Sequence, residues 1–239
     1  MSIAGAPSPC TSDSGGASWP PVVRLAASGV ALGLALPLDA LPTVTHWGAD
    51  PGPLDDAQLA SVAASARAPR ATNGVDVEVT VSVLPEGSRG WVGTTGVAGH
   101  RAGSAWSPRF VPTAMRTVDG DEGGFVEIDA TDPDAHLEVR LLIEMLPTGI
   151  VRMQARLTNT AEGDYLVEAV NLALPVPTRA RQLVDFAGRW AKEKVVQSRP
   201  FTVGSHVREG RHGRTGADAA TLLTAGTADL DFGGGEGWG

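Results

Sequence analysis

The stretch HLEVRLLIEMLPTGIVRMQARL, residues 136–157, decides the fold because apolar and polar side chains alternate on both sides of a short turn. Alternation with a period of two is typical of a β-strand with one face in a core and the other in water. The Pro-Thr-Gly triplet at 147–149 is a turn signal, so the sequence predicts an antiparallel hairpin of strands 136–145 and 150–157. A second break at 159–164 predicts a third strand of the same meander within 165–177.

The same alternation continues outward from this hairpin along most of the chain. It is clean at 75–83, where five valines alternate with polar residues. Further strands are predicted at 22–27, 29–36, 43–46, 125–129, 200–207 and 219–225. One segment, 54–68, has helical spacing instead, with Asp55 or Asp56 as its N-cap. The predicted fold class is therefore mostly β, a large antiparallel β-sandwich with one short helix.

Composition limits the class of protein and its location. The chain has 239 residues, of which 42% are hydrophobic, which is enough for a substantial core. A single cysteine, Cys10, excludes a disulfide within the chain and favours a cytoplasmic location. The apolar run at 30–41 is too short to cross a bilayer, so no membrane partner is expected. Residues 1–18, rich in small and polar residues, are expected to form a disordered leader before a folded domain at 19–239.

Recognisable motifs for catalysis, cofactors or metals are not found in the sequence. The five histidines form no HExxH pair, and neither a GxSxG elbow nor a GxxxxGK[ST] phosphate loop occurs. Carboxylates are frequent, but acid/base catalysis needs two of them in environments that separate their pKa values, which sequence alone does not reveal. We therefore expect no metal and no cofactor.

A basic stretch at 188–216 holds seven Arg and Lys residues in a chain whose formal net charge is −8. Nucleic-acid platforms interleave several aromatic side chains with their cations, whereas Trp190 is the only aromatic residue in 189–199. In the second half, Phe201, Val203 and Val207 alternate with polar residues, which predicts a strand with His206 and Arg208 on a solvated face. We expect no nucleic-acid partner.

Six segments, taken in order, resemble the N-terminal domain of bacterial α-galactosidases of glycoside hydrolase family 36, nearest to the actinobacterial branch. They are LPTVTHWGADPG (41–52), GWVGTTGVAGHRAGSAWSPRF (90–110), LTNTAEGDYLVEAVNLALPVP (157–177), DFAGRWxxE (185–193), RPFTVGSHVREGRHGRTG (199–216) and DFGGGEGWG (231–239). Their order and spacing make the resemblance more specific than any single segment.

This resemblance implies a large sandwich of the galactose-mutarotase-like supersandwich type, placed before a catalytic (β/α)₈ barrel. The family removes terminal α-linked galactose from oligosaccharides such as melibiose and raffinose, with two barrel aspartates as nucleophile and acid/base. Those aspartates have no counterpart in this chain. We therefore expect a C-terminally truncated, non-catalytic fragment that is inactive alone and whose partners are a downstream barrel and, through it, α-galactosides.

The resemblance also implies a homo-oligomer, in which an N-terminal-domain loop reaches toward the active site of a neighbouring subunit. At that loop this sequence carries Val-Ala-Gly-His-Arg at 97–101. The candidate substrate-proximal residues are His100, Arg101, Arg109 and Trp47. Trp91 and Trp106 are further aromatic side chains for which core or loop-anchoring roles are favoured over sugar stacking. Two alternatives stay open: a free-standing carbohydrate-binding sandwich, and an assembly module without sugar affinity.

Overall fold

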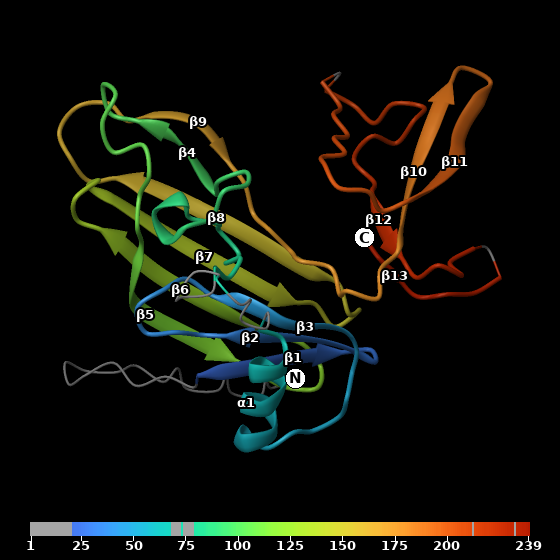
Figure 1. Ribbon diagram of the computed structural model, residues 1–239, viewed down its shortest axis with the longest axis horizontal. Coiled ribbons are helices and arrows are strands. Elements are labelled where there is room, and N and C mark those ends of the chain that lie inside the picture. Colours follow the sequence, from blue (N-terminus) through green and yellow to red (C-terminus); the bar gives the residue numbers. More distant parts are fainter. Residues whose placement is uncertain (1–20, 68–72, 74–78, 212, 232) are drawn as a thin grey trace, which may run out of the picture. The chain divides into compact units, whose positions relative to one another are not determined.

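A computed structural model describes residues 21–67, 73, 79–211, 213–231 and 233–239 and divides into two compact units (Figure 1). Unit 1 is Met1–Pro175 and unit 2 is Val176–Gly239. Unit 1 contains β1 (Val22–Ala27), β2 (Val30–Ala35), β3 (Thr43–Ala49), α1 (Asp56–Ser65), the 3-10 turn η1 (Gly87–Arg89), β4 (Val97–His100), β5 (Val111–Val118), β6 (Gly124–Asp132), β7 (Leu137–Met145), β8 (Val151–Asn159) and β9 (Leu166–Val170). Unit 2 contains β10 (Gln182–Arg189), β11 (Lys192–Pro200), β12 (Thr224–Gly226) and β13 (Gly237–Trp238). The expected leader at 1–18 lies outside the described residues.

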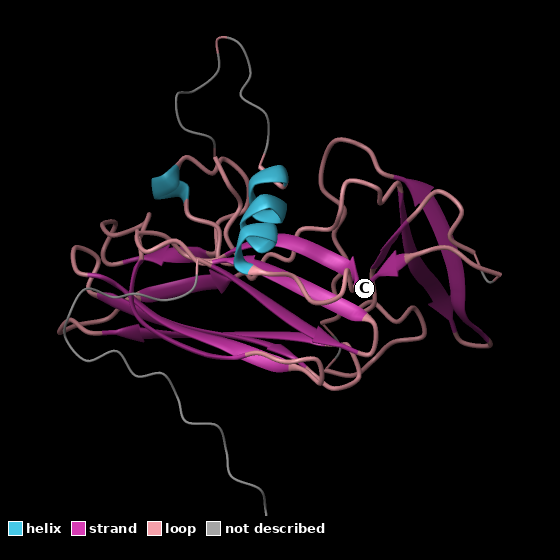
Figure 2. Ribbon diagram, turned by 90° about the horizontal axis from the view of Figure 1, so that it is seen from below, coloured by secondary structure: helices cyan, strands magenta, loops and turns pink. Residues whose placement is uncertain are grey.

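Unit 1 is a sandwich of antiparallel sheets, with its two layers seen edge on in Figure 2. One layer is the meander β5-β6-β7-β8, and the other contains β1-β2-β3 and the pair β4-β9. Inward side chains from both layers form one buried cluster, in which Leu32 of β2 and Leu141 of β7 are almost fully buried. The burial of these alternating faces is the main stabilising contribution to the unit. The mostly-β prediction with one short α-helix is confirmed for the described residues.

The hairpin that the opening stretch predicts is confirmed in position and direction. β7 and β8 pair antiparallel, with Leu141 opposite Ala155, around a turn in which Gly149 has a φ of 83°. A positive φ of this size favours glycine because it has no Cβ. The predicted helix also forms, and Asp55 is its N-cap: its carboxylate accepts from the Gln58 amide while the Gln58 side chain accepts from the Asp55 amide.

The predicted three-strand meander is wrong at its third strand. β9 pairs with β4 in the opposite layer rather than with β8. The turn after β8 is held closed by Asn159, whose side-chain amide donates to the Gly163 carbonyl at 2.7 Å and whose Oδ1 accepts from Arg101 of the β4 end. This contact joins the turn to a residue 58 positions earlier, which a local turn signal does not reveal.

Three other predicted strands differ from the structure. In 75–83, residues 75–78 lie outside the described residues, and 79–83 contain only an isolated bridge from Ser82 to Thr43. Segment 200–207 is not a strand: β11 ends at Pro200, and His206 in the irregular segment after it is turned toward Asp185 of β10. In 219–225 only the last two residues lie in a strand, β12. The hairpin β10–β11, which the sequence analysis did not predict, supplies the main part of the unit 2 sheet.

Candidate functional site

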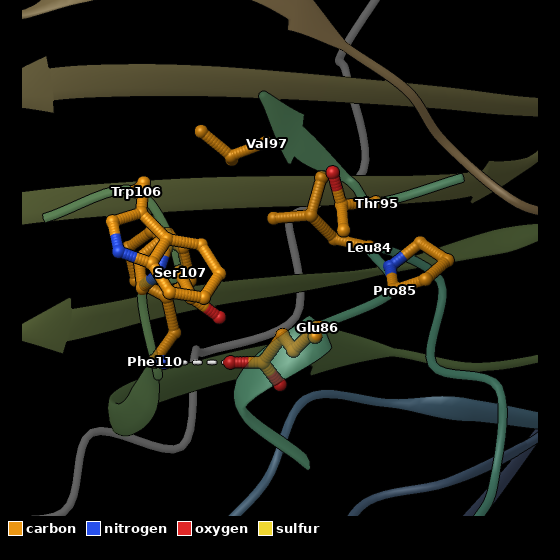
Figure 3. A pocket seen from close by; sticks show the side chains of 10 residues that line it. Leu84, Pro85, Glu86, Thr95, Val97, Trp106, Ser107 and Phe110 are labelled. Atoms are coloured by element: carbon orange, nitrogen blue, oxygen red, sulfur yellow. Dashed lines mark hydrogen bonds between the residues drawn. The ribbon is translucent and has the colours of Figure 1, made fainter. Parts of the chain in front are cut away.

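A small hollow in unit 1 is lined by the segment that leads into η1, by the start of β4 and by the loop that leads into β5. Its lining includes Leu84, Pro85, Glu86, Val97, Trp106 and Phe110. Figure 3 shows the Glu86 carboxylate directed at the Phe110 backbone rather than into open space. The hollow has room for about 10 Å³, which is close to the space that one water molecule occupies. A sugar ring does not fit in it.

Glu86 and Arg89 hold the Phe110 backbone from both sides. The Phe110 amide donates to Glu86 Oε1 at 2.7 Å, and Arg89 Nη2 donates to the Phe110 carbonyl at 2.9 Å. Arg89 Nε also donates to Glu86 Oε2 at 2.8 Å, which closes the clamp. The Glu86 side chain is almost fully buried, and the loss of hydration raises its pKa above the usual glutamate range. The phenyl ring of Phe110 is fully buried in the core, so the clamp anchors the loop to the sandwich.

A second buried carboxylate holds the neighbouring residue in the same way. Asp132, at the end of β6, accepts from the Arg109 amide at 2.7 Å and from the amides of Asp134 and Ala135 at 3.0 Å. Consecutive backbone amides are thus bound by two separate carboxylates from distant parts of the chain. Both acids are occupied in fixing the backbone.

His100 and Arg101 lie at the end of β4 and in the turn after it. His100 Nδ1 accepts from the Gly103 amide at 3.1 Å, which stabilises the turn. The Arg101 guanidinium donates to Asn159 Oδ1 at 2.7 Å and to three backbone carbonyls at 3.3 to 3.4 Å, and it lies 5.7 Å from the centre of the Tyr165 ring. Its hydrogen-bonding groups are directed at the protein.

Replacing Arg101 with lysine is expected to lower the free energy of unfolding of the chain by about 1–2 kcal/mol, because a point charge does not reproduce a planar fork that bridges several acceptors. Urea denaturation followed by circular dichroism measures the change. Arg109→Lys is the matched control, since the Arg109 side chain is exposed and makes no hydrogen bond to the other described residues. Equal stability of the two variants would show that the Arg101 contacts contribute nothing.

The other predicted site residues are not gathered around a shared cavity. The Arg109 side chain is exposed, and only its backbone amide is bound by Asp132. Trp47 lies in β3 and packs against the buried cluster. Trp91 is half-buried and donates from Nε1 to the Thr94 carbonyl at 2.9 Å, whereas 71% of Trp106 is exposed. Contact of any of these residues with a sugar stays a prediction.

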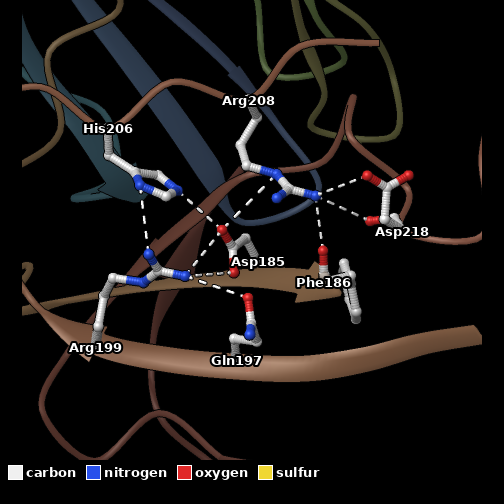
Figure 4. Close-up of polar contacts among 7 residues, drawn as sticks. All are labelled: Asp185, Phe186, Gln197, Arg199, His206, Arg208 and Asp218. Carbon is white, nitrogen blue, oxygen red and sulfur yellow. Dashed lines mark hydrogen bonds and ion pairs between the residues drawn. The ribbon is translucent and has the colours of Figure 1, made fainter. Parts of the chain in front are cut away.

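The densest charged cluster of unit 2 surrounds Asp185 on β10 (Figure 4). Asp185 is 1% exposed and accepts from Arg199 Nη2 at 3.0 and 3.2 Å and from His206 Nε2 at 2.8 Å. Arg208 Nε lies 3.7 Å from the same carboxylate, and Arg208 Nη2 donates to the Phe186 carbonyl at 2.7 Å. One buried carboxylate therefore binds side chains from β11 and from the loop that follows it.

Both ring nitrogens of His206 contact side chains of the cluster. An arginine can only donate, so the contact of 3.4 Å from Arg199 Nη1 makes His206 Nδ1 the acceptor. Nε2 then carries the hydrogen that is donated to Asp185. The expectation that His206 and Arg208 occupy a solvated face is wrong, because their polar groups face this carboxylate.

The sequence analysis missed the roles of Glu86, Asp132 and Asp185. A usable signal existed for Asp185, because it interrupts the apolar run Leu183-Val184-Asp185-Phe186 of a strand. A charge in such a run is buried with a partner or faces water, and the cationic residues within the next 25 positions supplied the partner. Nothing comparable marks Glu86 or Asp132.

Chemically, these arrangements bind backbone and side chains of the same chain. Among residues 21–67, 73, 79–211, 213–231 and 233–239, no three His, Cys, Asp or Glu side chains are grouped closely enough to hold a metal ion. No helix in that same part of the chain is long and apolar enough to cross a membrane. Fold and site together define the class: an antiparallel β-sandwich protein whose buried acids fix loops.

Comparison with known proteins identifies the family. Residues 40–239 match the glycosyl hydrolase family 36 N-terminal domain. An α-galactosidase of Escherichia coli is 30% identical over 177 residues, which cover 73% of this chain and 24% of the relative. The chain belongs to glycosyl hydrolase family 36 and covers its N-terminal domain.

Solved structures show the same fold at low sequence identity. An α-galactosidase of Geobacillus stearothermophilus, solved in complex with raffinose, has a TM-score of 0.72 and 15% identity over 88% of this chain and 32% of its own. The α-galactosidase of Lactobacillus brevis has a TM-score of 0.65 and 10% identity over 87% of this chain and 31% of its own. The chain thus spans about a quarter to a third of the length of these relatives.

Proposed function

We propose that this chain is the non-catalytic N-terminal domain of an α-galactosidase that hydrolyses terminal α-galactosides of the melibiose and raffinose type. Family membership supports the reaction class. The non-catalytic role rests on one observation: the buried carboxylates of Glu86, Asp132 and Asp185 are already bound to backbone amides or guanidinium groups of the same chain. A retaining glycosidase instead needs two carboxyl groups about 5 Å apart that face the sugar.

The partners proposed with this function are a catalytic (β/α)₈ barrel and further copies of the enzyme in a homo-oligomer. Relatives that are about three times as long as this chain support the first of these. Within the domain, we propose the turn at His100–Arg101, the exposed side chain of Arg109 and Trp47 of β3 as the residues that come near a substrate. The single cysteine supports a reducing, cytoplasmic location.

The purified chain is expected to release no p-nitrophenol from p-nitrophenyl α-galactoside, because the barrel aspartates are supplied from outside it. Replacing the matching stretch of the Escherichia coli α-galactosidase by this chain is expected to give a protein that does hydrolyse the substrate. Robust turnover by the chain alone, or a folded but inactive chimera, would contradict the proposal.

Calorimetric titration of the chain with galactose, melibiose and raffinose separates the proposal from the carbohydrate-binding alternative. No saturable heat is expected. The hollow beside Trp106 holds little more than a water molecule, and a larger hollow of about 330 Å³, lined by residues that include Asp129, Glu138 and Arg140, has no aromatic side chain on which a sugar ring could stack. Weak, saturable heats would favour a free-standing sugar-binding module.

A further inference from the structure

In residues 201–208, here called the inverted segment, the side chains of His206 and Arg208 are directed inward, whereas the three large apolar side chains are directed outward. His206 donates to buried Asp185 at 2.8 Å, and Arg208 Nη2 donates to the Phe186 carbonyl at 2.7 Å (Figure 4). Phe201, by contrast, is 42% exposed, Val207 is 70% exposed and Val203 is fully exposed. This arrangement is the opposite of the one that water favours.

The inversion is fixed by the charge cluster. Turning the valines inward would withdraw His206 and Arg208 from a carboxylate that is 1% exposed, and this would leave Arg199 as its one remaining partner among these three side chains. The apolar side chains are therefore held outward on an ordered backbone. A surface that is already ordered loses little conformational entropy when a partner covers it. Three large apolar side chains exposed within seven residues mark an interaction surface.

The surroundings of the inverted segment indicate the charge of its partner. Between residues 188 and 216 there are seven basic residues and two acidic ones. Arg199 and Arg208 face Asp185, and Arg211 pairs with Glu209. Within the described part of unit 2, no carboxylate lies within ion-pair distance of the remaining four, Arg189, Lys192, Lys194 and Arg214. A matching partner has an apolar centre with carboxylates around it.

We propose that the inverted segment binds the part of a family 36 α-galactosidase that lies beyond the stretch matched by this chain. This inference rests on the proposed function and deepens it by naming the contact surface. The chain spans 24% of the Escherichia coli relative and 32% of the Geobacillus enzyme, so such a partner has ample surface to cover Phe201, Val203 and Val207. An ordered apolar surface surrounded by cationic side chains fits a permanent protein–protein interface, because such interfaces are more hydrophobic than transient ones.

The test is co-expression of the full chain with a tagged form of the Escherichia coli α-galactosidase that lacks the matching stretch. The tagged partner is expected to retain the wild-type chain on purification. A chain carrying Val203→Asp and Val207→Asp is expected to be retained at least about tenfold less, because the two carboxylates would be buried in the interface. The matched control is Val92→Asp, a fully exposed valine in unit 1, which is expected to be retained like the wild type.

The folded state of each variant is checked separately by thermal melting of the isolated chain, where substitutions at exposed valines are expected to leave the melting temperature unchanged. Binding of a hydrophobic dye is expected to fall in the double variant and not in Val92→Asp. The inference is overturned by equal retention of the double variant, by no retention of the wild type, or by a wild-type dimer that the double variant abolishes, since a second copy would then be the occupant. A complex that forms as expected but hydrolyses no α-galactoside would refute the proposed function and leave this inference standing.

Discussion

Replacing Asp185 with asparagine is expected to lower the free energy of unfolding of Val176–Gly239 by about 3 kcal/mol, because it removes the charge that two guanidinium groups and His206 share. Asp185 is 1% exposed, so water does not reach the site to take over the hydrogen bonds of the lost carboxylate. This expected loss of stability is at the low end of the range for breaking a buried ion pair. The reason is that the Arg199 side chain is 41% exposed and keeps part of its hydration. Urea denaturation, together with the rate of limited proteolysis within residues 201–216, measures the loss.

The matched control is Glu209→Gln, in the same loop. Its ion pair with Arg211 is exposed, with 57% and 82% of the two side chains accessible, so no measurable change is expected. Proteolysis is informative because the Asp185 contacts fasten a long loop without regular structure to the sheet. If Asp185→Asn and Glu209→Gln had equal stability and equal cleavage rates, the cluster would have no anchoring role.

The strands with strict alternation were predictable because one face of each is buried in a shared core. β1 was predicted with its observed bounds, and the β7–β8 hairpin within two residues at each end. In such strands the register is fixed by the need to keep every second residue out of water. The N-cap was predictable for a different reason, since Asp55 is followed three positions later by Gln58 and the two complete a local capping box.

Segment 201–208 shows why the rest was not predictable from local pattern. Alternation separates two faces of a segment but does not say which face is buried. Here the decision is made by Asp185, 21 positions before His206, because a buried carboxylate is stabilised more by cationic and hydrogen-bonding partners than the loop is by burying two valines. The same limit applies to β9, because its alternation does not show that its partner is β4, about 70 positions earlier, rather than the preceding strand β8.

Site residues were predictable only as far as local chemistry marks them. The resemblance put His100 and Arg101 in one loop, whereas in the structure His100 ends strand β4 and Arg101 begins the turn after it, with the polar groups of both directed at the protein. Glu86 and Asp132 are ordinary acids in sequence. Their roles follow from the position of the Arg109–Phe110 backbone, which depends on the packing of the whole unit.

Substituting Glu86 with glutamine is expected to lower the free energy of unfolding of unit 1 by about 2 kcal/mol at neutral pH, because a buried donor loses its acceptor. A glutamine amide presents one oxygen and one NH₂ group, whereas Glu86 accepts from both the Phe110 amide and Arg89 Nε. Whichever way the amide turns, one of these donors then faces another donor. Urea denaturation measures the loss, and Ser88→Ala, which removes a hydrogen bond to the Pro108 carbonyl in the same loop, is the control with a smaller effect.

The same substitution is expected to change the pH dependence of stability. Burial raises the pKa of Glu86 in the folded chain, so the folded state holds this proton more tightly than the unfolded state does. The contribution of Glu86 to stability is therefore largest below the ordinary glutamate pKa and falls as the pH rises through the higher folded value. Glu86→Gln has no titratable group at this position. The unfolding free energy that it loses relative to wild type should therefore be larger near about pH 4 than near about pH 7, whereas the loss caused by Ser88→Ala should not depend on pH. Parallel profiles for wild type and Glu86→Gln would mean that the buried carboxyl binds its proton no more tightly than a glutamate in water, and the clamp on Phe110 would then owe nothing to the loss of hydration.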